Sequence, residues 1–200
     1  MSVNSVTNGL SQLSVGSGQA GRDDDPRFAR FASLEHAPAD HHYNNQVLGP
    51  KGSQWSVSVK REHGILASSL PPNMLVRVYE DRLDLVRCLI IGPLGTPFAQ
   101  APFLFDIRLP PASFPQSPPL VFFHSGSTRI SPNLYDNGTV CLSLLGTWPA
   151  GHACETWRAG HSSVLQLLVS IQGLILVRQP YFTEPGYERS KGIAQGEILR

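Results

Sequence analysis

The chain has 200 residues, a formal net charge of +1 and a charged fraction of 16%. This length allows one domain with a sizeable core, together with a tail. The near-neutral charge provides no basic field for nucleic acid or for an anionic membrane surface, so we expect neither as a partner. The chain has no run of about 18 apolar residues. Its first 30 residues also lack the apolar core of a secretory signal peptide, so we expect a soluble protein of the cytoplasm, the nucleus or both.

The three cysteines give no sign of a disulfide framework. Cys88, Cys141 and Cys154 are odd in number and have no short repeating spacing, which fits a reducing compartment and leaves at least one thiol available for chemistry. Cys154 lies near His152 and His161 in the sequence, but the spacing of these three residues matches no closed structural zinc site. We therefore expect no bound metal.

The N-terminal quarter of the chain has the composition of a tail. Residues 1–54 are rich in Ser, Gly, Asn and Asp and show no sustained apolar period, which predicts a flexible segment. The apolar positions of residues 55–70 fit a short helix, which Pro71 and Pro72 would end. We expect residues 55–200 to form the single folded domain.

The middle of the chain predicts an antiparallel sheet, and a helix follows it. Four short segments are rich in β-branched, aliphatic and aromatic residues and are bounded by proline or polar turns: 74–79, 85–91, 103–109 and 120–123. Sequential strands joined by tight turns predict a four-stranded antiparallel meander. Residues 163–177 form an apolar run too long for an ordinary strand, which indicates a buried central helix that covers the sheet. The fold class is therefore α+β, with a loop between sheet and helix.

That loop contains Cys141. The preceding residues 131–140 include proline, asparagine and glycine, which favour a structured loop. On this basis alone, a cysteine flanked by Val140 and Leu142 is more often a small buried hydrophobic residue than a nucleophile.

Several motifs in order resemble those of the ubiquitin-conjugating enzyme family. Pro132-Asn133, with Cys141 eight positions after the asparagine, is similar to the family's His-Pro-Asn motif and active cysteine. Residues 92–98 look like its Gly-Pro, Thr-Pro-aromatic turn, and residues 114–119 look like its aromatic-Pro, Pro-Pro turn. The resemblance runs from about residue 62 to the end. It is strongest to the large O-type members, which combine carrier and ligase. The same stretches also resemble those of the giant member with inhibitor-of-apoptosis repeats and of the Z-type member.

The resemblance implies the ubiquitin-conjugating fold and a two-step acyl transfer. Cys141 would receive the ubiquitin C-terminus as a thioester from an activating enzyme, which uses the ATP, and would pass it to a lysine of a protein substrate, with or without a separate ligase. A thiolate attacks thioesters well, and the product thioester still reacts with amines. The chain itself would need no cofactor. Arg200 comes before the family's usual final helices, so the sequence is either divergent there or a fragment.

Two further residues acquire roles from the resemblance. Asn133 matches the motif asparagine, whose amide either stabilises the oxyanion of the second step or holds the loop in shape. Ser131 stands where most members have histidine, which puts the local loop packing in doubt more than the chemistry. Glu184 aligns with the acidic residue that gates the active cleft. It would help to orient and deprotonate a lysine whose ordinary pKa is about 10.4.

On the central helix, the resemblance implies a ubiquitin-contacting face. Gln166, Val169 and Gly173 match positions that contact the thioester-linked ubiquitin in its closed pose, and their spacing places them on one helical face. Packing in the core is the alternative for Val169.

Two other functions stay open at this point. One is a non-catalytic ubiquitin-binding module of the same fold, against which the presence of both Cys141 and Asn133 argues. The other is a cysteine hydrolase that pairs Cys141 with His124 or His161, which would require a Cys-His contact.

Overall fold

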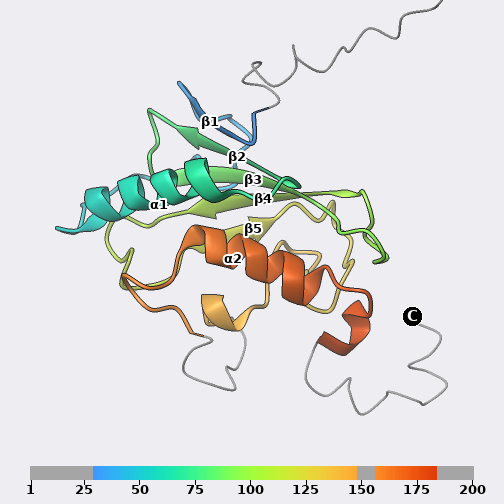
Figure 1. Cartoon of the computed structure of the whole chain (residues 1–200). Coiled ribbons are helices and arrows are strands. Elements are labelled where there is room, and N and C mark those ends of the chain that lie inside the picture. Colours follow the sequence, from blue (N-terminus) through green and yellow to red (C-terminus); the bar gives the residue numbers. More distant parts are fainter. Residues whose placement is uncertain (1–28, 148–155, 184–200) are drawn as a thin grey trace, which may run out of the picture.

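The computed structural model describes residues 29–147 and 156–183, in which one sheet is covered on one face by two helices (Figure 1). The strands are β1 (Phe31–Leu34), β2 (Met74–Tyr79), β3 (Leu85–Ile91), β4 (Pro102–Arg108) and β5 (Leu120–Phe123). Their order in the sheet is β1-β2-β3-β4-β5. Strands β2 to β5 pair antiparallel, which confirms the predicted meander and the α+β class, whereas β1 adds a fifth strand that pairs in parallel with β2.

Both predicted helices are present. The helical elements are α1 (Trp55–Ser69), α2 (Val164–Ser170), the π-helical η3 (Ile171–Ile175) and the short 3-10 helices η1 (Ser143–Leu145) and η4 (Pro180–Thr183). Helix α1 ends at Leu70, which is extended because it precedes Pro71. The predicted central helix, residues 163–177, is correct in place but not uniform, since α2 continues directly as the π-helical turn η3. Gly173 lies within that turn, and glycine is a poor α-helix former.

The core lies between the sheet and the helices. Trp55 of α1, Leu168 of α2 and Phe105 of β4 belong to one buried cluster. Cys88 of β3 is fully buried in the same cluster, and burial raises the pKa of its thiol. Cys88 is therefore a core residue rather than a nucleophile.

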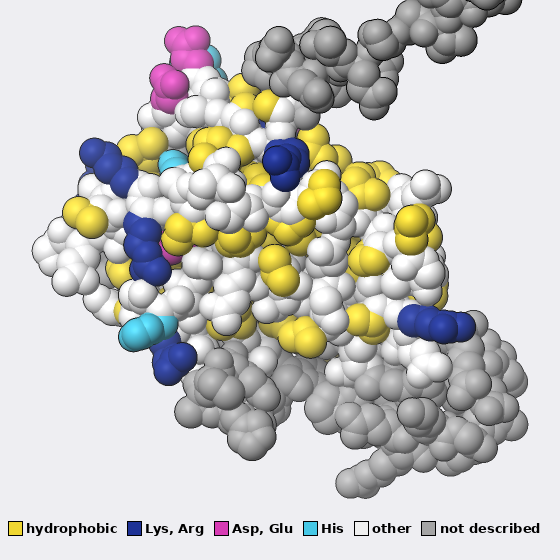
Figure 2. All heavy atoms as spheres, in the orientation of Figure 1, with side chains coloured by type: hydrophobic (Ala, Val, Ile, Leu, Met, Phe, Trp, Pro, Cys, Tyr) yellow, Lys and Arg dark blue, Asp and Glu magenta, His cyan; other side chains and the backbone are white. Residues whose placement is uncertain are grey.

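The surface over the helices is ordinary in composition. Figure 2 shows apolar side chains scattered over the face that carries α1 and α2, which is normal for a protein surface. Among the described residues, no helix is long and apolar enough to cross a membrane.

Residues 36–47, which we call the strap, pack on the sheet face opposite the helices. Within the strap, His41 and Tyr43 are buried. The Tyr43 ring packs with Tyr79 and Leu85 in a second, smaller cluster. The strap thus has its own anchor on the sheet.

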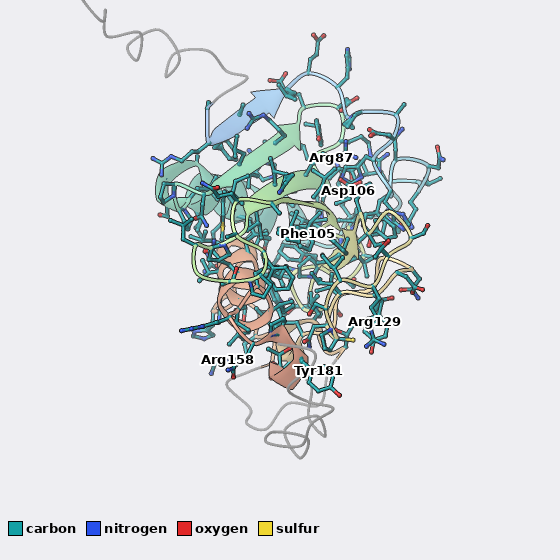
Figure 3. The ribbon with its side chains drawn as sticks, turned by 90° about the vertical axis from the view of Figure 1, so that its right-hand side faces the viewer. Arg87, Phe105, Asp106, Arg129, Arg158 and Tyr181 are labelled. Carbon is teal, nitrogen blue, oxygen red and sulfur yellow. The ribbon has the colours of Figure 1, made fainter. Side chains whose placement is uncertain are left out.

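A fully buried carboxylate, Asp106 of β4, holds the strap. It accepts two hydrogen bonds from Arg87 (2.7 and 2.9 Å) and one from the His42 backbone N–H (2.8 Å), and it lies 2.7 Å from His124 Nε2. Figure 3 shows Arg87 and Asp106 close together, with Phe105 turned toward the core. Burial alone would raise the pKa of Asp106, but these hydrogen bonds hold it below its ordinary value. The His42 ring also stacks on Phe122, with ring centroids 3.6 Å apart.

A second fully buried carboxylate, Asp84, helps to hold the end of the strap on the sheet. Arg82 and Arg108 both bind Asp84, at 2.9 and 3.0 Å. The same two guanidinium groups donate to strap carbonyls, Arg82 to Gln46 (3.0 Å) and Arg108 to Val47 (2.7 Å). Each arginine therefore links a buried carboxylate to a backbone carbonyl of the strap, at residues that do not belong to a strand.

The prediction of a flexible tail over residues 1–54 is thus wrong for residues 31–47, which form β1 and the strap. The polar composition misled the prediction because buried charged groups far along the chain, together with a few ring contacts such as that of Tyr43, hold this segment. Residues 1–28 lie outside the described part of the chain.

Asp106→Asn is expected to lower the free energy of unfolding by about 3 to 5 kcal/mol, because it leaves the Arg87 charge without its buried partner. Urea unfolding at pH 7 measures this change. Asp40→Asn is the matched control, since Asp40 also binds Arg87 (3.0 Å) but its side chain is 74% exposed. The control should change stability by less than about 1 kcal/mol. Equal losses in the two variants would contradict the buried pair as the anchor.

Candidate functional site

The segment that follows β5 folds back as a structured loop, as predicted. Leu134 and Val140 form an antiparallel bridge, and the Phe123 N–H donates to the Gly138 carbonyl at 2.8 Å. Gly138 has φ +87°, and a Cβ there would lie 2.1 Å from the Phe122 ring. Only glycine fits this position, which fixes the loop against β5.

The loop brings Cys141 and Asn133 together. The Cys141 N–H donates to the Asn133 carbonyl (2.9 Å), and the Asn133 side chain donates from Nδ2 to the Cys141 carbonyl (3.2 Å). Both residues are nearly buried, with 8% and 6% of their surfaces exposed. The Thr183 hydroxyl of η4 lies 2.5 Å from Asn133 Oδ1 and 2.6 Å from the Pro180 carbonyl, and donates to one of them at a time. The Asn133 amide is thereby oriented with its nitrogen toward Cys141.

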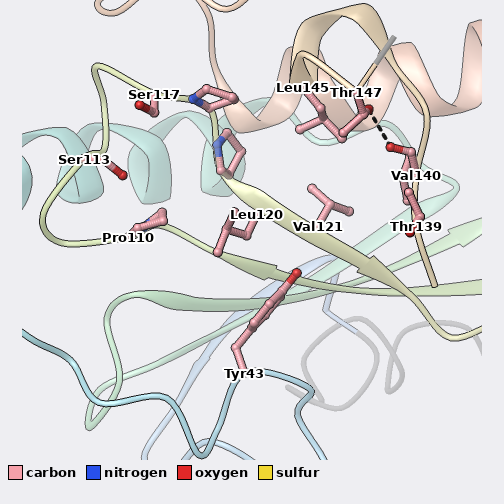
Figure 4. Close-up of a pocket in the computed structure, with 12 residues that line it drawn as sticks. Tyr43, Pro110, Ser113, Ser117, Leu120, Val121, Thr139, Val140, Leu145 and Thr147 are labelled. Carbon is pink, nitrogen blue, oxygen red and sulfur yellow. Dashed lines mark hydrogen bonds between the residues drawn. The ribbon is translucent and has the colours of Figure 1, made fainter. Parts of the chain in front are cut away.

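A second threonine closes the other side of the loop. The Thr147 hydroxyl donates to the Val140 carbonyl (2.7 Å) and accepts from the Leu142 N–H (2.9 Å), so it bridges the residues on either side of Cys141. Thr147 and Val140 also line a cavity of about 290 Å³, into which Tyr43 of the strap projects (Figure 4).

Sequence reasoning missed both threonines. Neither was given a role, because a lone threonine in an irregular stretch carries no local signal. The contact between Thr183 and Asn133 joins residues 50 positions apart, so it follows only from the way η4 returns to the loop.

Within residues 29–147 and 156–183, the described contacts of the two histidines considered for a hydrolase lie elsewhere. His124 places Nε2 against the buried Asp106, and its described role is to help anchor the strap. The His161 N–H donates to the Arg158 carbonyl (3.1 Å), and no described contact joins its ring to Cys141.

Two predictions fall partly outside the described residues. Glu184 is one residue beyond the described segment, so its role in the cleft stays a prediction. His152 and Cys154 also lie outside, and within the described ranges no group of three potential ligands could hold a metal ion.

The three predicted ubiquitin-contacting residues are all on the surface. Gln166 and Val169 of α2 and Gly173 of η3 are exposed, and Val169 exposes 45% of its area. The alternative that Val169 packs in the core is therefore wrong. Leu174, which the sequence did not single out, is 56% exposed beside Gly173. Their role toward ubiquitin stays a prediction.

A buried carboxylate fixes the start of α2. Ser163 caps the helix by accepting the Gln166 N–H (3.1 Å), and Glu62 of α1 accepts the Val164 N–H (2.8 Å). Glu62 is only 2% exposed. Burial raises the pKa of Glu62, and the Val164 hydrogen bond only partly opposes this effect.

A pH dependence of stability follows from Glu62. Because its pKa is raised in the folded state, its stabilising contribution is complete below the unfolded pKa and is lost as pH rises through the folded pKa. Glu62→Gln keeps an acceptor for the Val164 N–H but cannot ionise. We expect the variant to lose less stability than the wild type between pH 4 and pH 7 in urea unfolding. Glu80→Gln, at an exposed position, is the control and should follow the wild type. If the free energy of unfolding changed with pH in the same way for all three proteins, the prediction would be contradicted.

Comparisons with known proteins agree with this geometry. The family model described as "Ubiquitin-conjugating enzyme" matches residues 58–191, which include Asn133 and Cys141. The structure of human ubiquitin-conjugating enzyme E2 G1 covers 62% of this chain and 96% of its own, with 24% identity and a TM-score of 0.51, and therefore supports the fold.

Two curated relatives are more similar in sequence. A probable ubiquitin-conjugating enzyme E2 25 of Arabidopsis thaliana is 50% identical over 172 residues, which are 85% of this chain and 28% of that protein. The human dual E2 ubiquitin-conjugating enzyme/E3 ubiquitin-protein ligase BIRC6 is 44% identical over 167 residues, 78% of this chain and 3% of that protein. The chain thus spans less than a third of either relative. With the motif cysteine and asparagine in contact and the family model matched over most of the chain, the chain belongs to the ubiquitin-conjugating enzyme family.

Proposed function

We propose that this chain carries ubiquitin as a thioester on Cys141 and transfers it to a lysine of a protein substrate. In the first step the Cys141 thiolate attacks the thioester carbonyl on the activating enzyme, whose thiol leaves. In the second step the neutral lysine amine attacks the new thioester, a C–N bond forms and the C–S bond breaks. The amine loses one proton to solvent, and the Cys141 thiolate is regenerated. ATP is consumed by the activating enzyme, so the chain needs no cofactor of its own.

The observation that carries the proposal is the contact between Asn133 and Cys141. The second step passes through a tetrahedral oxyanion, which an amide N–H donor close to the cysteine can stabilise. Asn133 Nδ2 donates one N–H to the Cys141 backbone carbonyl at 3.2 Å, and the second N–H of the amide would be the one to serve the oxyanion. Glu184 would orient the incoming lysine.

The exposed face of α2 and η3 would hold the attached ubiquitin. Gln166, Val169 and Gly173 are exposed there, and an exposed valine and leucine on a helix offer apolar contact to a partner. Contact with a folded ubiquitin would restrict the thioester to geometries open to attack.

We also propose that transfer proceeds without a separate ligase. The human relative BIRC6 is named as a dual E2 ubiquitin-conjugating enzyme/E3 ubiquitin-protein ligase. The resemblance supports the idea, because many members of the family dock ligases through an apolar residue two positions after the aromatic of the aromatic-Pro turn, and this chain has Gln116 there. The chain would act in the cytoplasm, the nucleus or both.

A charging assay tests the carrier function. The chain is mixed with activating enzyme, ATP and ubiquitin, and a non-reducing gel is read for an adduct that thiol removes. We expect this adduct, and we expect it to disappear when ATP is omitted. A known carrier is charged in parallel. If that carrier charges and this chain does not, the carrier function is wrong, and ubiquitin binding without charging would indicate the non-catalytic module.

A further inference from the structure

The loop that carries the candidate nucleophile is built like a narrow hairpin, and we call residues 131–141 the cysteine loop. At its open end, the Cys141 N–H donates to the Asn133 carbonyl (2.9 Å). At its closed end, the Gly138 N–H donates to the Tyr135 carbonyl (3.1 Å). The two residues of the reaction site therefore lie at one end of a short hairpin, and the turn at the other end determines how the hairpin is oriented.

The turn of the cysteine loop lies against the ring of Phe122 in β5. A Cβ on Gly138 would lie 2.1 to 2.6 Å from three atoms of that ring, so the glycine backbone and the ring are in close contact. The adjacent Phe123 N–H donates to the Gly138 carbonyl (2.8 Å), and the Ser125 hydroxyl donates to the Asp136 carbonyl. Because close-packed groups cannot move independently, the position of the Phe122 ring constrains the position of the turn.

The strap packs on the same ring. The His42 ring stacks on the Phe122 ring, with centroids 3.6 Å apart and an angle of 5° between the ring planes. His42 is exposed and Phe122 is half-buried, so the imidazole covers part of Phe122 on the solvent side. The His42 backbone N–H donates to Asp106 (2.8 Å), and His124, which also binds Asp106, contacts the Phe122 ring edge-to-face at 5.2 Å. The strap is thus linked to the cysteine loop through Phe122.

A second observation places the strap beside the cysteine loop. Tyr43 follows His42 in the strap and lines the cavity of about 290 Å³ together with Thr139 and Val140 of the loop (Figure 4). The rings of His42 and Tyr43 are in edge-to-face contact, with centroids 4.7 Å apart. The strap therefore lies next to the loop both at its turn and along the residues that lead to Cys141.

We propose that His42 is a positioning residue for the transfer step, an inference that rests on the proposed carrier function. Its ring holds Phe122 against Gly138, and the fixed turn keeps Cys141 and Asn133 in the geometry that attack by an amine requires. Reaction rates depend steeply on such placement, so a small tilt of the loop slows the transfer. His42 takes no part in the acyl transfer itself and acts through Phe122.

The test is single-turnover discharge of the pre-charged chain to free lysine, with the rate of charging measured separately. We expect His42→Ala to slow discharge about threefold to tenfold, the range that loss of one aromatic pair would give. Charging should change by less than about twofold, because thiol exchange does not need the Asn133 amide. His42→Phe should restore the wild-type rate, since it keeps a planar ring on Phe122. The backbone N–H that binds Asp106 is present in both variants, so the strap stays anchored.

A double-mutant cycle shows whether His42 acts through Phe122. Phe122→Leu removes the ring but keeps an apolar side chain, and in this background His42→Ala should cause no further loss of discharge. His36→Ala is the matched control. His36 is also a histidine of the strap, but its side chain is 73% exposed and lies 3.3 Å from Asp81. This variant should discharge like the wild type.

The outcomes separate the positioning role from the proposed function. If no thioester forms, the carrier function fails and the positioning role fails with it. If the wild type and His42→Ala both charge and discharge at the same rates, the positioning role alone is overturned. It is also overturned if charging and discharge fall by the same factor, or if His42→Phe does not restore the rate, because His42 would then only stabilise the fold. A loss that is equal with and without the Phe122 ring overturns the action through Phe122.

Discussion

Replacement of Cys141 by serine is expected to abolish transfer to lysine and to turn the ubiquitin adduct from a thiol-sensitive thioester into a thiol-stable oxyester. The serine hydroxyl can still accept the acyl group, but an ester is much less reactive toward an amine than a thioester. Gels run with and without thiol after charging measure the change, and a chase with free lysine measures the loss of transfer.

Cys88→Ala is the matched control for that experiment. Cys88 is fully buried in the core, and burial raises the pKa of its thiol, so its removal should leave the adduct unchanged. Circular dichroism confirms that both variants fold. A thiol-sensitive adduct that persists on Cys141→Ser would place the carrier on another cysteine and would overturn the assignment.

Asn133→Ala is expected to slow discharge to lysine by roughly 10²- to 10³-fold, the typical cost of one lost oxyanion donor. The charging step exchanges one thioester for another and should slow far less. Single-turnover discharge, measured on protein that has been charged to completion, separates the two steps.

The same variant decides between the two roles of Asn133. Its Nδ2 bonds to the Cys141 carbonyl in this structure, so removal of the amide also removes a loop contact. If loop support dominates, charging and discharge should fall together and the melting temperature should drop. Thr183→Val is the companion variant, because it removes the hydroxyl near Asn133 Oδ1 while the Nδ2 donor stays. It should reduce discharge less than Asn133→Ala does. A larger effect of Thr183→Val would contradict the oxyanion role.

The sequence alone predicted the elements whose signals are local. Strands β2 to β5 and helix α1 were correct because alternation, β-branched residues and flanking prolines act within a few positions. The order of the motifs was enough to select Cys141 and Asn133, and their contact agrees with that choice. The exposure of Val169 could not be read from the sequence, since an apolar residue on a helix fits either the core or the surface.

The tertiary structure alone decided the features that depend on distant partners. The strap looked like a tail because it is polar, yet it is held to the sheet largely by groups around Asp106 of β4 and Asp84, just before β3, which are buried and must be paired. The Thr183 contact with Asn133 requires η4 to return to the cysteine loop. The sequence therefore determined which residue is the candidate nucleophile. The fold determined what surrounds that residue, because the partners of buried charges and of hydrogen bonds lie far apart along the chain, where no local sequence pattern connects them.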